Sequence, residues 1–173
     1  GDQDTSTVVG LAGALRLFGE TNEALAVLQK HEASGPQRKG YLFNLGDIHA
    51  ELDNLRESKK AFSELVELHP EVADFSVALS KAMQAMGEEE EAISTLKESI
   101  KRYPEQFAAD IALSQLYGDR GQKGKAVTTI ERAYKRPNGE SLPVLKQYIR
   151  ALAENGSVER FAKVLQTYQE LWQ

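Results

Sequence analysis

The sequence contains no cysteine and only five prolines among its 173 residues. Without cysteine, disulfide bonds, thiolate catalysis and cysteine-ligated zinc sites are excluded. This absence does not decide between the cytoplasm and the bacterial periplasm, because proteins of both compartments can lack cysteine. No apolar run approaches the ~20 residues that a membrane-spanning helix needs, so we expect no direct insertion into a membrane.

An excess of basic residues is also missing. Lys and Arg number 21 against 26 Asp and Glu, which gives a net charge of −5. Because nucleic-acid-binding proteins usually carry a basic surface, we expect no nucleic-acid partner. Hydrophobic residues make up 41% of the chain and charged residues 27%, a composition typical of a folded protein. The chain begins with Gly1, so we expect a processed protein or a segment of a longer one.

Motifs of catalysis and cofactor binding are absent from the sequence. It contains no phosphate-binding glycine loop, no serine elbow and no HExxH motif. His31, His49 and His69 lack the spacing of metal ligands, either to one another or to a pair of carboxylates. We therefore expect no catalytic residue, no metal site, no cofactor and no enzymatic activity.

The few prolines are regularly spaced. Pro36, Pro70 and Pro104 stand 34 residues apart, and Pro137 falls one residue short of the same interval. A period of about 20–50 residues indicates a repeat architecture. Because proline lacks an N–H and disfavours helix in the residue before it, this column predicts recurring helix ends.

Other positions repeat at the same interval: a turn residue, a small residue five positions later, a leucine and the small residue after it. These columns are Gly19, Asp53, Gly87 and Gly121; Ala24, Ser58, Ala92 and Ala126; Leu11, Leu45, Leu79 and Leu113; and Ala12, Gly46, Ser80 and Ser114. Small residues let two helix axes approach to about 8–10 Å. Apolar residues are spaced three or four apart, which predicts an all-α fold of amphipathic helices in pairs.

The acidic run from Glu88 to Glu91 fits the first turn of a helix. It follows Gly87, the expected turn residue, and its charge complements the positive end of a helix dipole. Lys101 and Arg102 stand at the other end, where cations are favoured. The alternative interpretation is an acidic docking site for a basic partner.

The pattern resembles the tetratricopeptide repeat (TPR), whose unit of 34 residues contains two helices and ends at a proline. Leu79-Ser80, Ala92 and Pro104 match the family pattern in the third unit, and the other units match it in part. The column that holds tryptophan in the family contains Val8, Leu42, Ser76 and Asp110, so we expect weaker packing there. The resemblance implies a right-handed superhelical solenoid of antiparallel helix pairs. It predicts a single array over residues 1–173, with repeats at about 5–38, 39–72, 73–106 and 107–140 and a degenerate pair at 141–173.

The same resemblance implies a non-catalytic scaffold that binds a partner protein or peptide in a concave groove lined by the first helices. The groove residues it predicts form an apolar column and a polar one: Val9, Phe43, Val77 and Ile111; and Asp47, Lys81 and Gln115. We hypothesise that the apolar column receives an apolar or amphipathic segment, with Asp47 and Lys81 setting its register by charge. The alternative is that the apolar column only packs between neighbouring helices.

Two further functions stay open at this stage. The chain could be part of a larger array that self-associates through its terminal helices, where Leu171 and Trp172 are large and apolar. It could also be the regulatory domain of an enzyme whose active site lies elsewhere. Resemblance to bacterial family members implies a setting in a secretion, pilus or polysaccharide-export assembly.

Overall fold

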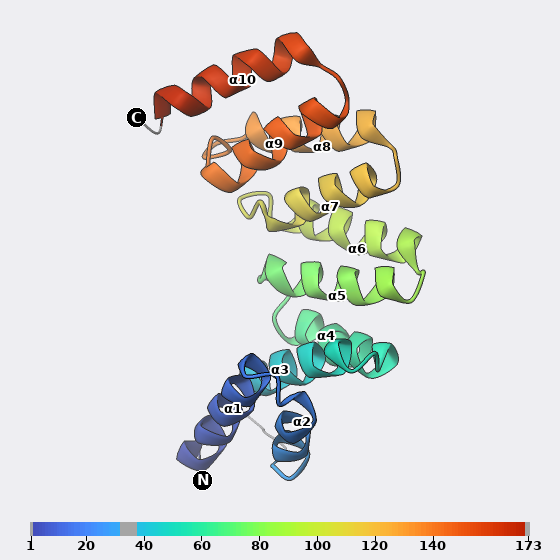
Figure 1. Cartoon of the computed structure of the whole chain (residues 1–173), viewed down its shortest axis with the longest axis vertical. Coiled ribbons are helices and arrows are strands. Elements are labelled where there is room, and N and C mark those ends of the chain that lie inside the picture. Colours follow the sequence, from blue (N-terminus) through green and yellow to red (C-terminus); the bar gives the residue numbers. More distant parts are fainter. Residues whose placement is uncertain (1, 32–37, 172–173) are drawn as a thin grey trace. The chain divides into compact units, whose positions relative to one another are not determined.

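The computed structural model describes residues 2–31 and 38–171, which form ten helices and no strand (Figure 1). Pro36 and Trp172 lie outside the described residues. No helix in the described ranges is both long and apolar enough to cross a membrane. The helices, in order, are α1 (Asp2–Leu17), α2 (Thr21–Gln29), α3 (Arg38–Glu51), α4 (Leu55–Leu68), α5 (Ala73–Ala85), α6 (Glu89–Arg102), α7 (Ala108–Asp119), α8 (Lys123–Tyr134), α9 (Leu142–Glu154) and α10 (Val158–Leu171).

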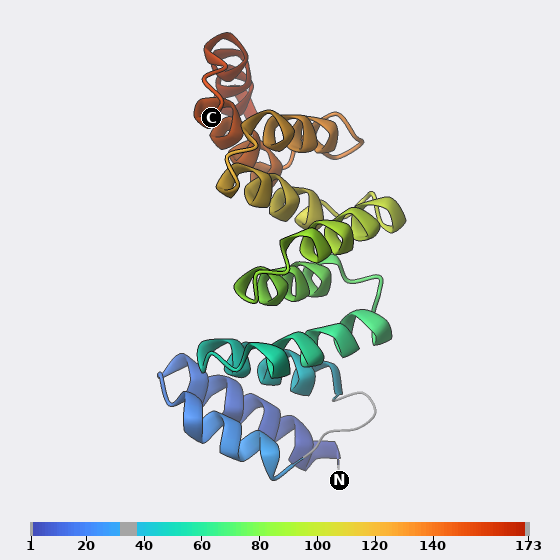
Figure 2. The ribbon, with the colours of Figure 1, turned by 90° about the vertical axis from the view of Figure 1, so that its right-hand side faces the viewer.

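The chain divides into two compact units, residues 1–92 and residues 93–173. In the first unit α1 packs against α2 and α3, and α4 packs against α3 and α5. In the second unit α7 packs against α8 and α9, and α9 packs against α8 and α10. Within the pairs α1–α2, α3–α4, α7–α8 and α9–α10 the two helices are antiparallel and joined by short turns (Figures 1 and 2). The repeat boundaries and the single array predicted above stay predictions.

The turns within the helix pairs share one backbone conformation. Gly19, Gly87, Gly121 and Gly156 have φ between +70° and +84°, and Asp53 has φ +60°. In every one of these turns the next residue donates its N–H to the carbonyl five residues earlier, at 2.8–3.0 Å. This bond closes the helix C-terminus in the Schellman manner, which requires a left-handed residue and favours glycine. The predicted turn column is therefore confirmed.

The column of small residues lies at helix–helix contacts, as predicted. Ala12, Ser80 and Ser114 are fully buried, and Gly46 is buried against the ring of Phe62. A Cβ at position 46 would stand 2.7 Å from two atoms of that ring. Glycine thus lets Phe62 of α4 lie directly on the backbone of α3, which places this ring at the base of the site described below.

Helix ends also follow the sequence. Pro70 and Pro104 lie between helices, and Pro137 follows α8. Helix α6 begins at Glu89, so three glutamates of the acidic run occupy its first turn. Lys59 of α4 bonds to the carboxylate of Glu88 and, at 3.2 Å, to that of Glu91. Part of the acidic run is therefore engaged within the first unit, which supports the helix-end interpretation over a free docking site.

The column that replaces the family's tryptophan is buried throughout. Val8, Leu42, Ser76 and Asp110 are each at most 8% exposed. Asp110 is compensated by Arg136, whose Nη2 donates to Oδ2 of the carboxylate. The guanidinium carbon of Arg136 lies 5.0 Å from the centroid of the Phe107 ring. An ion pair beside an aromatic ring thus takes the place of a single large side chain.

Candidate functional site

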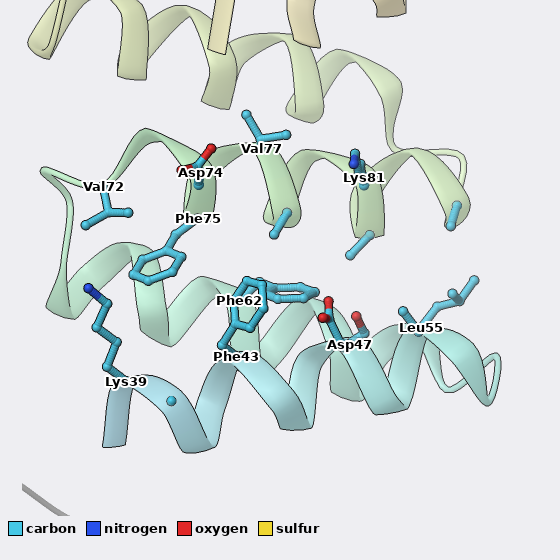
Figure 3. A pocket seen from close by; sticks show the side chains of 16 residues that line it. Lys39, Phe43, Asp47, Leu55, Phe62, Val72, Asp74, Phe75, Val77 and Lys81 are labelled. Carbon is cyan, nitrogen blue, oxygen red and sulfur yellow. The ribbon is translucent and has the colours of Figure 1, made fainter. Parts of the chain in front are cut away.

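A pocket of about 780 Å³ lies in the first unit, between the first helices α3 and α5 and over α4 (Figure 3). Helix α3 contributes Phe43 and Asp47, and α5 contributes Phe75, Val77 and Lys81. Pockets of about 300–1,000 Å³ that combine apolar walls with a few polar groups are typical binding sites. We therefore treat this pocket as the candidate site for a ligand.

Three phenylalanines gather at the centre of the pocket (Figure 3). The ring centroid of Phe43 lies 6.2 Å from that of Phe62, with an edge-to-face geometry, and 6.1 Å from that of Phe75. Phe62 and Phe75 are buried, at 3% and 5% exposure, whereas Phe43 is only half-buried. Two rings therefore fix the third through favourable aromatic contacts and leave part of Phe43 facing the pocket.

Asp47, at the other end of the pocket, is an engaged carboxylate. Its Oδ2 lies 3.2 Å from Nη1 of Arg16, which also bonds to Glu51 at 2.9 Å. Burial raises the pKa of Asp47 above its usual value; Arg16 and Lys81 oppose this shift, and Glu51 adds to it. Asp47 therefore already has a cationic partner within the chain, so it attracts a cation of the ligand less strongly than the sequence predicts.

The two lysines of the pocket differ in their surroundings. Lys39 places its Nζ 5.3 Å from the ring centroid of Phe75, a cation–π distance. Lys81 is exposed, and within the described part of the chain no carboxylate lies within ion-pair distance of it. Lys81 is thus a positive group open to a ligand at the edge of an apolar pocket.

The structure brings together four of the seven residues predicted for the groove, namely Phe43, Asp47, Val77 and Lys81. Val9 does not line the pocket; it is half-buried beside α3, its Cγ1 3.2 Å from the Cβ position of Gly40. Ile111 and Gln115 lie on α7 in the second unit. There Gln115 Nε2 contacts Gln147 Oε1 at 3.4 Å.

Sequence analysis missed Phe75 and Lys39 as residues of this site. Phe75 precedes Val77 by two positions, so helical periodicity places it on another face of α5. It nevertheless lines the pocket because the pocket extends from α3 over α4 to Val72, just before α5. Repeat columns identify equivalent positions, but they do not give the distance between two neighbouring helices.

The described residues hold no group of three or more His, Asp or Glu side chains placed to bind a metal ion. His49 is half-buried, and its pKa is lowered mainly by burial. Its Nδ1 lies 3.5 Å from the amide nitrogen of Asn54, at the turn between α3 and α4. His49 therefore contacts the turn that joins its helix pair.

Comparison with known proteins agrees with this geometry. The family model described as tetratricopeptide repeat matches residues 43–107, a range that includes α4, α5, α6 and most of the pocket. This part of the chain carries the tetratricopeptide repeat pattern. Among curated proteins, no sequence matches it with significance. Proteins with these repeats are generally scaffolds for protein–protein interaction and typically lack catalytic activity.

Solved tetratricopeptide structures share the fold at low sequence identity. The MamA protein has a TM-score of 0.66 at 18% identity, with 98% of this chain and 92% of that chain covered. A thermophilic TPR protein of Thermus thermophilus has a TM-score of 0.62 at 20% identity, with 94% and 99% covered. A putative kinesin light chain with TPR-like repeats from Podosopora anserina has a TM-score of 0.68 at 20% identity, with 95% and 93% covered. The all-α tetratricopeptide solenoid fold is thereby confirmed.

Proposed function

We propose that the chain is a non-catalytic scaffold that binds a segment of a partner protein in the pocket between α3 and α5. The observation that carries this proposal is the half-buried ring of Phe43, held between two buried phenylalanines and facing a pocket of about 780 Å³. A ring that packs on two buried aromatic rings and still faces a pocket can contact a further apolar side chain. A rigid, partly exposed ring in a pocket is typical of a residue that anchors a partner.

The pocket is suited to one apolar side chain of the partner, followed by an acidic group. Burying a Leu, Ile or Phe side chain contributes roughly 1.5–3 kcal/mol, so the apolar contact supplies most of the affinity. Lys81, which has no carboxylate partner among the described residues, would receive the acidic group at the edge of the pocket. Asp47 is already held by Arg16 and would act by limiting which charges are accepted.

The double change Phe43→Glu and Val77→Glu tests the site. Charges in the apolar wall should abolish capture of partner proteins from a lysate of the source organism, because a bound apolar side chain would bury them, while the chain stays folded by circular dichroism. Phe18→Glu is the matched control, because Phe18 is 85% exposed and lies outside the pocket. A captured protein supports the proposal only if the Phe18→Glu variant still binds it and the double variant does not. A large fall in melting temperature without loss of capture would assign these residues to packing alone.

A second variant avoids removing apolar contacts. Ala78→Phe adds a ring at a half-buried position that lines the pocket, so it should fill the space a partner needs without creating a cavity. Loss of the same captured proteins with an unchanged circular dichroism spectrum would support the proposal. Retention of those proteins by Ala78→Phe would place their binding elsewhere.

Other parts of the hypothesis stay predictions. Self-association through the terminal helices depends on Trp172, outside the described residues, and is tested by light scattering of the wild type and Trp172→Glu. Concentration-dependent oligomers that this change abolishes would support it. The role as a regulatory domain of an enzyme and the setting in a bacterial secretion, pilus or polysaccharide-export assembly rest on family resemblance alone.

A further inference from the structure

The second unit contains a pocket of a different chemical character, formed largely by the second helices of their pairs. It has a volume of about 690 Å³ and is lined by α6, α7 and α8. Its charged residues are Lys97, Lys125, Arg132, Arg136 and Asp110. Four cations and one carboxylate thus converge on one hollow in a chain whose net charge is −5.

Asp110 does not neutralise the other cations, because it is already engaged. The carboxylate accepts a hydrogen bond from Arg136, and only 3% of its side-chain surface is exposed. Arg136 is fixed in turn against the ring of Phe107. This pair accounts for one positive and one negative charge, which leaves Lys97, Lys125 and Arg132.

In the described part of the second unit, these three cations form no ion pair with a carboxylate. Lys125 instead places its Nζ 5.4 Å from the ring centroid of Tyr117, a cation–π distance. Glu131, on the same helix as Lys125 and Arg132, is bound instead to Lys135 and Arg160. Like charges around a low-dielectric hollow raise its positive potential and favour a bound anion.

Apolar side chains form the floor of this pocket. Ile100 of α6 is half-buried and lines the pocket, together with the buried side chains of Leu113 and Tyr117 of α7. A small inorganic ion would leave this apolar floor uncovered. The floor and the three cations together fit a ligand that carries carboxylates beside an apolar side chain.

We propose that the hollow between α6 and α8 binds an acidic amphipathic segment of a partner protein. An apolar side chain of that segment packs on Ile100, and its carboxylates meet Lys97, Lys125 and Arg132. This proposal is independent of the function proposed for the first unit, since the two pockets share no residue.

A nucleic acid fits the hollow less well. Single-stranded nucleic acids bind to aromatic rings that are open for base stacking. Tyr117 is buried and its ring lies under the ammonium group of Lys125, so it offers no such surface. An acidic protein segment is therefore the favoured class.

The experiment titrates the whole chain against a fluorescent synthetic peptide of Glu and Leu residues and measures anisotropy at several salt concentrations. The control peptide has Gln in place of every Glu. We expect the acidic peptide to bind, to weaken as salt rises, and to bind at least about tenfold more tightly than the Gln peptide. No binding of the acidic peptide to the wild type, or equal binding of the two peptides, would overturn the proposal.

A pair of variants locates the site. Lys97→Glu with Lys125→Glu reverses two charges of the pocket and should weaken the acidic peptide at least about tenfold. Lys101→Glu with Lys123→Glu makes the same charge change on the same helices, outside the pocket, and should leave affinity within about threefold. All four lysines are exposed, so both variants should fold. An equal loss of peptide affinity in both variants would overturn the proposal. It would also be overturned if a single-stranded oligonucleotide bound the wild type more tightly than the peptide and lost its affinity for the pocket variant.

Discussion

Asp110 of α7 is bound by Arg136, which follows the end of α8, although Asp110 is buried and lies in a column that the family fills with tryptophan. Burial raises the pKa of Asp110, and Arg136 opposes this rise by hydrogen bond and charge. Nε of Arg136 is itself buried and has no hydrogen-bond partner in the described part of the chain. Each group therefore compensates the other, and removal of Arg136 would leave a buried carboxylate without a counter-charge.

Arg136→Gln should destabilise the second unit by on the order of 3 kcal/mol at neutral pH, because a buried carboxylate loses its counter-charge. The folded pKa of Asp110 already lies above its unfolded value, and the substitution raises it further. Ionised Asp110 thus disfavours the folded state, and this penalty is relieved as pH falls through the folded pKa. Urea denaturation from pH 7 to pH 4 should show the gap between Arg136→Gln and the wild type narrowing. Asp110→Asn added to Arg136→Gln should restore part of the stability at pH 7. A stability difference between Arg136→Gln and the wild type that does not depend on pH would contradict this account.

Gly46→Ala should lower the free energy of unfolding although alanine is the better helix former. The added Cβ would lie 2.7 Å from two atoms of the Phe62 ring, an overpacking that costs about 1–3 kcal/mol. Helix propensity returns up to about 1 kcal/mol of this. Gly10→Ala in α1 is the control, since its Cβ would meet no atom within 4 Å, and should be neutral or stabilising. Chemical denaturation monitored by circular dichroism measures both; equal midpoints would show that Phe62 moves aside without cost.

Gly121→Ala should destabilise the α7–α8 turn by about 1–2 kcal/mol, because φ at this position is +70° and a Cβ disfavours the left-handed conformation. Gly124→Ala, three residues later and inside α8, should instead stabilise by up to about 1 kcal/mol, since its Cβ would enter open space. Both substitutions replace glycine by alanine in the same helix pair. Opposite changes in stability would therefore show the effect of the turn conformation alone. Thermal melts of both variants measure the signs.

Ser114→Ala should cost about 1–2 kcal/mol although alanine fits the small-residue column. Ser114 Oγ donates to the carbonyl of Ala126 at 3.0 Å and accepts from Nε2 of Gln147 at 3.1 Å, so its loss leaves buried polar groups unsatisfied. Ser80→Ala at the equivalent position in α5 should be nearly neutral, because Ser80 Oγ donates only to Val77 of its own helix. Urea midpoints of the two variants test the difference, and a cost as large for Ser80 would refute this interpretation of the bonds.

Much of the fold could be predicted from the sequence because its determinants are local and repeated. A left-handed turn residue, a small contact residue and a helix-ending proline each act within one helix pair, so their columns stay visible at a constant interval. Burial was harder to predict. Leu11, Leu79 and Leu113 share a column, yet Leu11 is 49% exposed while the other two are at most 5% exposed. A column fixes the face of a helix, whereas the neighbouring helix decides whether that face is covered.

The candidate site was predicted only in part for the same reason. Phe43, Asp47, Val77 and Lys81 stand at matching positions of neighbouring repeats and line one pocket. The partnership of Asp47 with Arg16 crosses between helix pairs and depends on the reach of a long side chain, which no periodic pattern encodes. The basic pocket of the second unit was not predicted, because its cations come from separate parts of the sequence and form no basic run.

The left-handed residue at the end of the first helix of each pair has a practical consequence. Four of these positions are glycine, and the fifth is Asp53, whose short polar side chain tolerates that conformation. A library randomised at positions 19, 53, 87, 121 and 156 and selected for resistance to protease should return glycine, asparagine and aspartate and reject β-branched residues. These five positions therefore tolerate few substitutions although they lie at solvent-exposed corners, where sequences usually vary freely.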